Sequence, residues 1–262
     1  MKELNHKIHG KVLRPASFQE LFSQICQPSG KHNHRVWMWR GQSDVSWKID
    51  SSGYRRLKAS SNYQTGDGEK DLIRYESNLL QQATHRGYRY SEGRVLTDFE
   101  LLARLQHHGA ATRLVDFTRN ALVGLWFACA ENISKSGLLI GFDTWYLGGY
   151  EKELENRSYA EIVADLGDYP LITWEPPGIS PRIAVQHSQF IYSAVSDSSR
   201  GSLVFPEEGA FRLFEITPRL KRESLEILTQ VFDIDRSVLF PDIDGFSSYH
   251  SVSEDISGMH RW

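Results

Sequence analysis

The chain has 262 residues, 40% of them hydrophobic and 12% aromatic, which suits one large domain or two small ones with a sizeable core. The formal net charge of −3 argues against a chain that is basic overall, as many nucleic-acid-binding proteins are, but it leaves room for a local basic cleft. The two cysteines, Cys26 and Cys129, exclude a disulfide framework.

The opening residues lack the basic and apolar regions of a secretory leader, and no apolar stretch reaches about 18 residues. We therefore expect a soluble, cytoplasmic protein that makes no contact with a membrane.

The first predicted element is a short helix that begins at Ser17, where apolar residues recur at helix spacing. The aromatic and β-branched run HRVWMWRGQ, residues 34–42, predicts a strand that ends in a turn. An amphipathic helix is predicted over residues 69–87, followed by a glycine-ended helix whose capping box is Thr97 and Glu100.

Residues 111–118 are β-branched and aromatic and predict a further strand. Asn120 is suited to cap the next helix, ALVGLWFACAEN, which is apolar on every side and should therefore be buried. A buried strand is predicted over residues 137–143, and a helix near residues 157–166.

Strands are predicted over residues 182–195 and 211–216, and a last long helix begins at Thr217-Pro218, with proline in the first helical position. Helices and strands alternate without repeats, and the apolar strands lie too far apart for simple hairpins. The pattern predicts one α+β domain with a mixed β core flanked by helices.

Two stretches near the predicted first strand carry basic side chains. Arg40 precedes Gly41, so its guanidinium, which suits phosphate, lies beside backbone that a ligand can approach closely. Ser52 belongs to a pair of serines that precedes Arg55 and Arg56 and could bind phosphate or ribose. The alternatives are a structural ion pair for Arg40 and a solvated turn for the serines.

A polar cluster over residues 106–118 includes His107, His108, Arg113 and Asp116. Adjacent histidines leave a helix about 100° apart, so we do not expect them to chelate one metal ion. Asp116 lies between apolar residues and needs a partner, such as Arg113 or a nearby hydroxyl, if it is buried. Structural pairing and catalysis both fit this aspartate.

The segment RIAVQHSQF, residues 182–190, is the last polar candidate. If it is a strand, alternation places Arg182 and Gln186 on one side. Gln186 then faces either a site or the surface. Phosphate-binding glycine loops and the Gly-x-Ser-x-Gly pattern are absent from the sequence, which gives no support to kinase, Rossmann or α/β-hydrolase functions.

Four blocks of the sequence resemble, in order, the blocks of the FRG domain family, which is named for a Phe-Arg-Gly signature. Trp39 stands at the phenylalanine, and Arg40 and Gly41 match. The resemblance covers roughly residues 35–246. The blocks are WMWRGQSDVSWKIDSSGYRRL, LARLQHHGAATRLVDFTRNALVGLWFACA, RIAVQHSQF and VLFPDIDGF.

The order of elements is also similar to that of the ADP-ribosyltransferase fold, and this similarity implies a function. It implies that NAD is the substrate and that a macromolecule, RNA or protein, accepts the ADP-ribose. The strand that carries a glutamate in that fold has Gln186 here, so Asp116 is expected to supply the carboxylate. The residues implied in catalysis are Asp116, Gln186 and His108. Those implied in holding NAD are Arg40, Gly41, Gln42, Ser52 and Arg113.

Such enzymes in bacteria and phages often act as toxins or defence proteins, which implies a neutralising partner such as an antitoxin or a chaperone. The domain organisation that follows is an N-terminal helical extension (1–34), the FRG-like domain (35–250) and a C-terminal tail (251–262).

Two other functions remain open. One is a non-catalytic module that binds RNA or a phosphate ligand in a basic, aromatic groove formed by Arg40, Arg55, Arg56, Arg113 and Trp47. The other is a structural interaction protein in which the polar cluster serves only the core.

Overall fold

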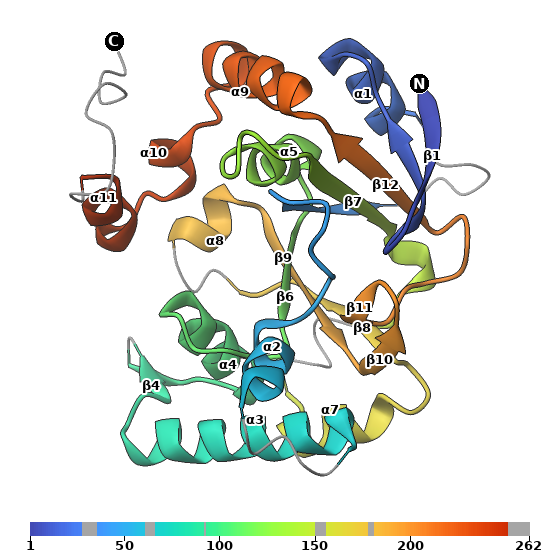
Figure 1. Cartoon of the computed structure of the whole chain (residues 1–262). Coiled ribbons are helices and arrows are strands. Elements are labelled where there is room, and N and C mark those ends of the chain that lie inside the picture. The colour runs from blue at the N-terminus through green and yellow to red at the C-terminus, as the bar shows by residue number, and fades with distance from the viewer. Residues whose placement is uncertain (28–35, 61–65, 92, 150–155, 178–180, 251–262) are drawn as a thin grey trace.

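The part of the chain that the computed structural model describes is built on an eight-stranded mixed sheet (Figure 1). The described residues are 1–27, 36–60, 66–91, 93–149, 156–177 and 181–250. The strands lie in the order β1-β2-β12-β7-β3-β6-β9-β8. Their bounds are β1 Lys2–His6, β2 Gly10–Arg14, β3 Trp37–Gln42, β6 Val115–Thr118, β7 Gly137–Asp143, β8 Leu171–Trp174, β9 Ser188–Ser193 and β12 Phe211–Ile216.

Two small hairpins complete the β structure: β4 (Tyr90–Ser91) pairs with β5 (Arg94–Val95), and β10 (Val195–Ser198) pairs with β11 (Gly201–Leu203). In the large sheet β2 and β12 are parallel, and the other neighbours are antiparallel.

Helices cover the sheet and its ends, and several begin where the sequence predicts. Thr97 and Glu100 form the capping box of α4, Asn120 caps α5, and Pro218 occupies the first turn of α9. The bounds are α1 Phe18–Ile25, α2 Ser52–Ala59, α3 Gly68–His85, α4 Asp98–His107, α5 Ala121–Cys129, η1 Thr144–Tyr146, α7 Tyr159–Asp165, α8 Pro181–Val185, α9 Pro218–Phe232, α10 Arg236–Leu239 and α11 Ile243–Tyr249.

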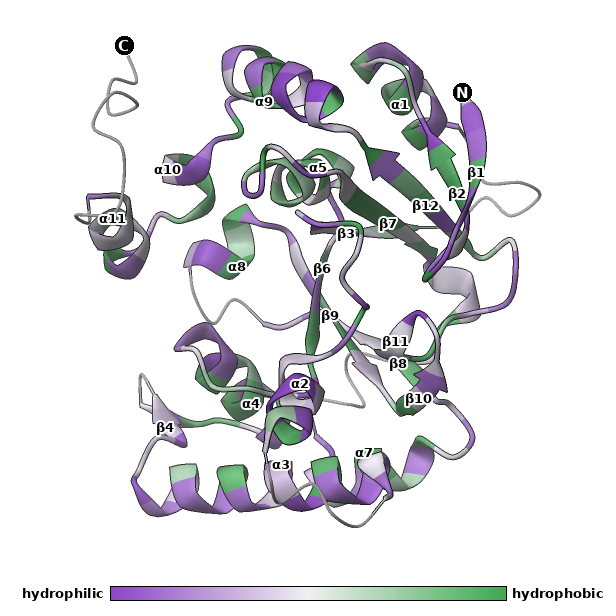
Figure 2. Ribbon diagram, in the orientation of Figure 1, coloured by the Kyte–Doolittle hydropathy of each residue, from purple (hydrophilic) through white to green (hydrophobic). Residues whose placement is uncertain are grey.

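Alternation along the strands divides the apolar side chains between the two faces of the sheet. Every residue of β7 is buried; Ile140 packs on one face, while Leu139 packs against α5 on the other. Helix α5 is apolar throughout, as Figure 2 shows, because it lies between the sheet and α9.

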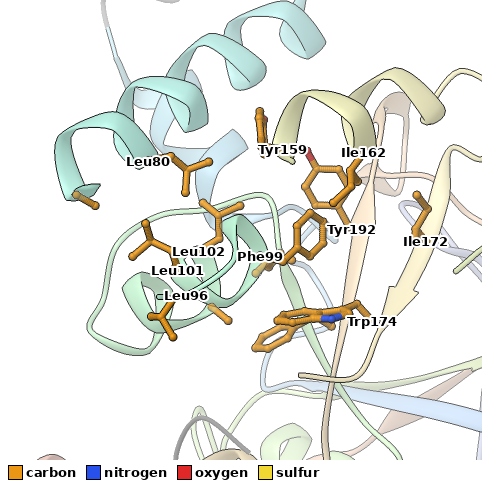
Figure 3. Close-up of a cluster of buried hydrophobic side chains, with 14 of the residues drawn as sticks. Leu80, Leu96, Phe99, Leu101, Leu102, Tyr159, Ile162, Ile172, Trp174 and Tyr192 are labelled. Carbon is orange, nitrogen blue, oxygen red and sulfur yellow. The ribbon is translucent and has the colours of Figure 1, made fainter. Parts of the chain in front are cut away.

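Two groups of helices share one face of the sheet. Helices α1, α5 and α9 pack over β3, β7 and β12, where Trp39 and Phe214 are buried. Helices α3, α4 and α7 pack over β8 and β9, where Phe99 contacts Trp174 and Tyr192 (Figure 3). Strand β6 lies between β3 and β9, at the boundary between the two groups of helices. Its residues on this face therefore lie in the gap between the groups.

The structure confirms the α+β class with a mixed sheet flanked by helices, and it also departs from the sequence predictions. The described part of the expected helical extension, residues 1–27, contains the hairpin β1–β2 besides α1, and β2 joins the sheet. These two strands form one edge of the sheet, and Val12 is their only fully buried residue, so they lack a strong apolar alternation. The predicted tail, 251–262, lies outside the described residues.

The strand predicted over residues 182–195 is wrong in its first half. Residues 181–185 form helix α8, and His187 has a positive φ of 48°. The chain therefore turns before β9 begins at Ser188. Similarly, β6 occupies only the second half of the strand predicted over residues 111–118. None of the helices in the described ranges combines the length and the hydropathy that a membrane span requires.

Candidate functional site

A cavity of about 350 Å³ lies where the two helix groups part, and we call it the cleft. Ligand sites in proteins typically start at about 300 Å³. The lining residues come from β3, β6 and β9, from α4, α5 and α8, and from the segment after α10. They are Trp39, Arg40, Gly41, Ala103, Gln106, His107, Asp116, Phe117, Thr118, Gly124, Phe127, Arg182, Ile183, Gln186, Ser188, Phe190 and Phe240.

Asp116 reaches the cleft because of its place on β6. Its neighbours Val115 and Phe117 are buried on the opposite face of the sheet, so alternation turns Asp116 towards the divided helical cover. The carboxylate is exposed, and its Oδ1 accepts a hydrogen bond of 2.9 Å from Nε2 of Gln106 on α4. Asp116 is therefore not buried, and its partner is Gln106 rather than Arg113 or a hydroxyl.

Arg40 comes from the next strand and is partly buried. Among the described residues β3 and β6 pair only at Trp39 and Thr118. Beyond that pair the Arg40 side chain extends across to β6, where Nη1 donates to the backbone oxygen of Asp116 at 2.7 Å. Its buried Nε has no hydrogen-bond partner within the described chain.

The environment of Arg40 favours an anionic ligand. Burial lowers the pKa of its guanidinium, Asp116 opposes that shift, and the neighbouring positive charge of Arg55 adds to it. An arginine keeps its charge under such conditions. A buried N–H donor without a partner carries a desolvation cost that an incoming acceptor would remove.

Gly41 lines the cleft, but its missing side chain serves packing. A Cβ at this position would lie 2.1 Å from the backbone oxygen of Gly124 and 2.3 Å from the nitrogen of Ala128, both on α5. Helix α5 therefore lies directly against β3 at this point. The close approach of α5 is thus one reason for a glycine here, and the predicted approach of a ligand to Gly41 stays a prediction because the residue also lines the cleft.

Gln186 reaches the cleft from the turn after α8 rather than from a strand. Its Nε2 donates to the backbone oxygen of Leu239 at 2.8 Å, and its own backbone oxygen accepts from Thr118. Arg182, one helical turn earlier, also lines the cleft and pairs with Asp242 at 2.6 Å. Residues four positions apart lie on the same side of a helix and also of a strand. The sequence therefore places Arg182 and Gln186 on one side correctly, although it predicts a strand where the structure has a helix.

The structure thus brings Arg40, Asp116 and Gln186 together from three distant parts of the chain. It does not bring Ser52 to them, because the Ser52 hydroxyl donates to the backbone oxygen of Thr112 and accepts from its N–H. The functional roles of the three residues in the cleft stay predictions.

Arg113 is also absent from the cleft. Its guanidinium is buried between α3 and β9, where it pairs with Glu69 and Glu76 and lies 4.9 Å from the ring centroid of Tyr192. These acidic partners are 44 and 37 residues away in sequence, so the local polar cluster gives no sign of them. Arg113 belongs to the core, which corrects its assignment to NAD binding.

The histidine that lines the cleft is His107, whereas the sequence analysis selected His108. His108 is the C-cap of α4, and its side chain is 61% exposed. Gln106, His107 and Arg182 also line the cleft, although the sequence analysis gave none of them a role in the site. A useful signal was available for Gln106, which lies one helical turn after the buried Leu102 near the end of α4.

The two histidines also lie close to a carboxylate. Potential ligand atoms of His107, His108 and Asp244 all lie within 4.8 Å of one another. Adjacent histidines on a helix diverge at their Cα–Cβ bonds, but the ring nitrogens lie beyond two rotatable bonds and can turn towards each other. The two histidines can therefore share a ligand here, contrary to the sequence expectation.

A second, larger cavity of about 1390 Å³ adjoins the cleft, and we call it the outer groove. It shares Arg40, Gly41, Phe127 and Phe240 with the cleft. Gln42 lines it from β3, with its Nε2 held by the backbone oxygen of Lys48. The groove also contains Arg55 and the exposed indole of Trp47, and it is bounded by α10 and α11.

Comparison with known protein families supports the resemblance of the first two sequence blocks to the FRG domain. Residues 35–137 match the FRG domain family. This stretch of the chain is therefore similar to the FRG domain. The match runs from the start of β3 to the start of β7, so it includes Arg40 and Asp116, and the resemblance beyond residue 137 stays a prediction. No curated protein and no solved structure matches the chain.

The signature of the FRG domain has a physical explanation in this structure. Trp39 is buried against Phe214 beneath α5, Arg40 extends into the cleft, and Gly41 admits the backbone of α5. Each of the three positions thus has a separate requirement: an aromatic core residue, a charged residue that lines the cleft and a residue without a side chain.

Proposed function

We propose that this protein is an NAD-dependent ADP-ribosyltransferase-type effector of bacterial or phage origin, a toxin or defence protein that modifies RNA or protein. One observation carries the proposal: the exposed carboxylate of Asp116 and the guanidinium of Arg40 face the same cleft, and the Arg40 Nε lacks a partner among the described residues. An anion holder next to a carboxylate is what this chemistry needs.

The arrangement suits cleavage of a nicotinamide–ribose bond. The bonding electrons leave with nicotinamide, positive charge develops on the ribose carbon, and the Asp116 carboxylate would stabilise that charge. Gln106 holds this carboxylate in place. The acceptor then bonds to the ribose carbon and loses a proton to solvent or to Asp116.

The cavities also suit a dinucleotide in size. Arg40 lies at the junction of the cleft and the outer groove. A ligand with a nucleoside at each end could place one end in the cleft and extend into the groove, with its central phosphates at Arg40.

The first prediction separates binding from turnover. Arg40→Ala should weaken NAD binding at least about tenfold, because it removes a charged hydrogen-bond donor. Asp116→Asn should bind NAD but release nicotinamide about a hundredfold more slowly, because it removes the stabilising charge. Calorimetry measures the binding, and chromatographic detection of nicotinamide in the presence of a bacterial extract measures turnover.

Matched controls are Arg86→Ala and Asp168→Asn, which change exposed residues outside both cavities. Both should behave as the wild type, and in a bacterial host both should arrest growth on expression as the wild type does, while the cleft variants should not. The proposal fails if the wild-type protein neither binds NAD nor releases nicotinamide with any extract.

A second candidate is a module that binds single-stranded RNA without turnover, and the outer groove favours it. Trp47 is 45% exposed in a groove that also contains Arg40 and Arg55. Aromatic faces next to guanidinium groups suit stacked bases with phosphates between them. Arg113 is buried in the core, and neither Arg113 nor Arg56 lines the groove.

This second function predicts a salt-dependent affinity for an RNA oligonucleotide. Trp47→Ala should weaken it by roughly tenfold through the loss of stacking. The matched control is Trp145→Ala, because Trp145 is 57% exposed outside the groove. Fluorescence anisotropy at two salt concentrations measures both effects, and equal losses in the two variants would contradict this function.

A further inference from the structure

The end of α4 and the start of α11 meet at the rim of the cleft, where they bring nitrogen and oxygen donors together. His107 lines the cleft, and His108 follows it at the helix C-cap. The two imidazole rings have centroids 5.0 Å apart and are nearly perpendicular. Asp244 comes from α11, and its Oδ2 lies 4.0 Å from Nδ1 of His108. Potential ligand atoms of these three residues all lie within 4.8 Å of one another.

A fourth donor lies beside this group. Oδ2 of Asp242 is 3.6 Å from Nε2 of His107 and is buried without a hydrogen-bond partner in the described part of the chain. The other oxygen, Oδ1, accepts from Arg182 and from the N–H of Gly245. The charge of Arg182 is therefore already paired, and the second carboxylate oxygen of Asp242 remains close to His107.

The chemical types of the donors suit a transition metal. An imidazole nitrogen binds such an ion through its lone pair. Two imidazoles and a carboxylate form a donor set typical of zinc and other first-row transition metals.

We propose that His107, His108 and Asp244 bind a divalent transition-metal ion such as Zn²⁺, with Asp242 next to the open coordination position. Tetrahedral zinc ligands at about 2.0–2.1 Å from the metal lie about 3.4 Å from one another. The donors must therefore approach by on the order of 1 Å. Two of the three can move freely, because the side chains of His108 and Asp244 are 61% and 65% exposed.

Such an ion would fix α11 relative to the cleft. Helix α11 exposes its apolar residues, with Ile243 79% and Phe246 64% exposed, so few core contacts hold it. The ion would link α11 to α4 at a residue that lines the cleft. The site does not depend on NAD chemistry, and it would set the position of the helix that bounds the outer groove.

Calorimetric titration of the full chain with Zn²⁺, after removal of metals with a chelator, tests the site without NAD. We expect one equivalent to bind to the wild type and the affinity to fall at least about tenfold in His108→Ala and in Asp244→Asn. His85→Ala and Asp168→Asn, which change exposed residues elsewhere, should bind as the wild type does. Zn²⁺ should also raise the melting temperature of the wild type but not of Asp244→Asn.

The proposal is overturned if the wild type binds no Zn²⁺, or if His108→Ala and Asp244→Asn bind it as tightly as the two control variants. Circular dichroism of each variant without metal checks that it is folded. Because NAD is absent from every titration, the result is independent of the proposed transferase activity: a zinc site without turnover, or turnover without a zinc site, separates the two proposals.

Discussion

Gly41→Ala is expected to destabilise the protein by about 3 kcal/mol or more, at or above the upper end of the usual range for overpacking. The added methyl group would lie 2.1 Å from the backbone oxygen of Gly124 and 2.3 Å from the nitrogen of Ala128. Both are main-chain atoms of α5, so no side chain can rotate to make room. Helix α5 would have to move off β3, taking its packing on α9 with it.

Urea denaturation followed by circular dichroism measures this effect, and Gly167→Ala is the matched control. A Cβ at Gly167 would lie 3.9 Å from the oxygen of Ala164, which is an ordinary contact, so the change should stay within about 0.5 kcal/mol. If Gly41→Ala instead unfolds at the same urea concentration as the wild type and loses only ligand binding, the glycine is needed for a ligand to approach. Packing against α5 would then not explain it.

Sequence reasoning was most successful where local chemistry determines structure. Thr97 and Glu100 determine the start of α4 because both capping interactions lie within one turn. Strand β7 was recognised because a short, wholly apolar run leaves few alternatives. Helix α8 was missed because its five residues are too few to show a period, and β-branched residues then favour a strand.

The candidate site was harder to predict because it depends on contacts between distant segments. Arg40 and Asp116 were selected through a family resemblance, and no local pattern shows that their strands are neighbours. The apolar sequence neighbours of Asp116 are compatible with a buried, paired aspartate and equally with an exposed catalytic one. Alternation alone explains its exposure, once the sheet shows that the helical cover parts above β6. The choice between His107 and His108 likewise requires the position of α4.

The second large effect concerns Arg113, whose removal should destabilise the protein by about 3–5 kcal/mol. Arg113 is 1% exposed and pairs with Glu76, which is fully buried and also accepts from the backbone N–H of Arg113 and from the hydroxyl of Tyr159. In Arg113→Met the apolar stem is kept, but the Glu76 carboxylate loses the positive charge that offsets its burial. Urea denaturation of the variant measures the loss.

The double variant Arg113→Met, Glu76→Gln is the matched control, because it removes both charges. It should be more stable than Arg113→Met alone, since an uncharged amide has no buried charge to compensate. If the role of Arg113 is purely steric, the stability losses from Arg113→Met and Glu76→Gln should add, and the double variant should be less stable than Arg113→Met. Wild-type stability with weaker NAD binding in Arg113→Met would restore the ligand-binding role that the sequence suggested.

The pH dependence of Arg113→Met provides an independent check of the same charge. Burial raises the pKa of the Glu76 carboxyl, and Arg113 opposes this shift, so the pKa should rise further in the variant. A carboxyl whose pKa is higher in the folded than in the unfolded state binds more protons when folded, and stability then falls as the pH rises from the ordinary carboxyl pKa through the folded one. The stability deficit of Arg113→Met should therefore be smaller at a pH of about 5.5 than at about 8. This difference should disappear when Glu76 is glutamine, because an amide does not titrate, whereas a deficit that is independent of pH would mean that packing, not the buried carboxylate, accounts for the loss.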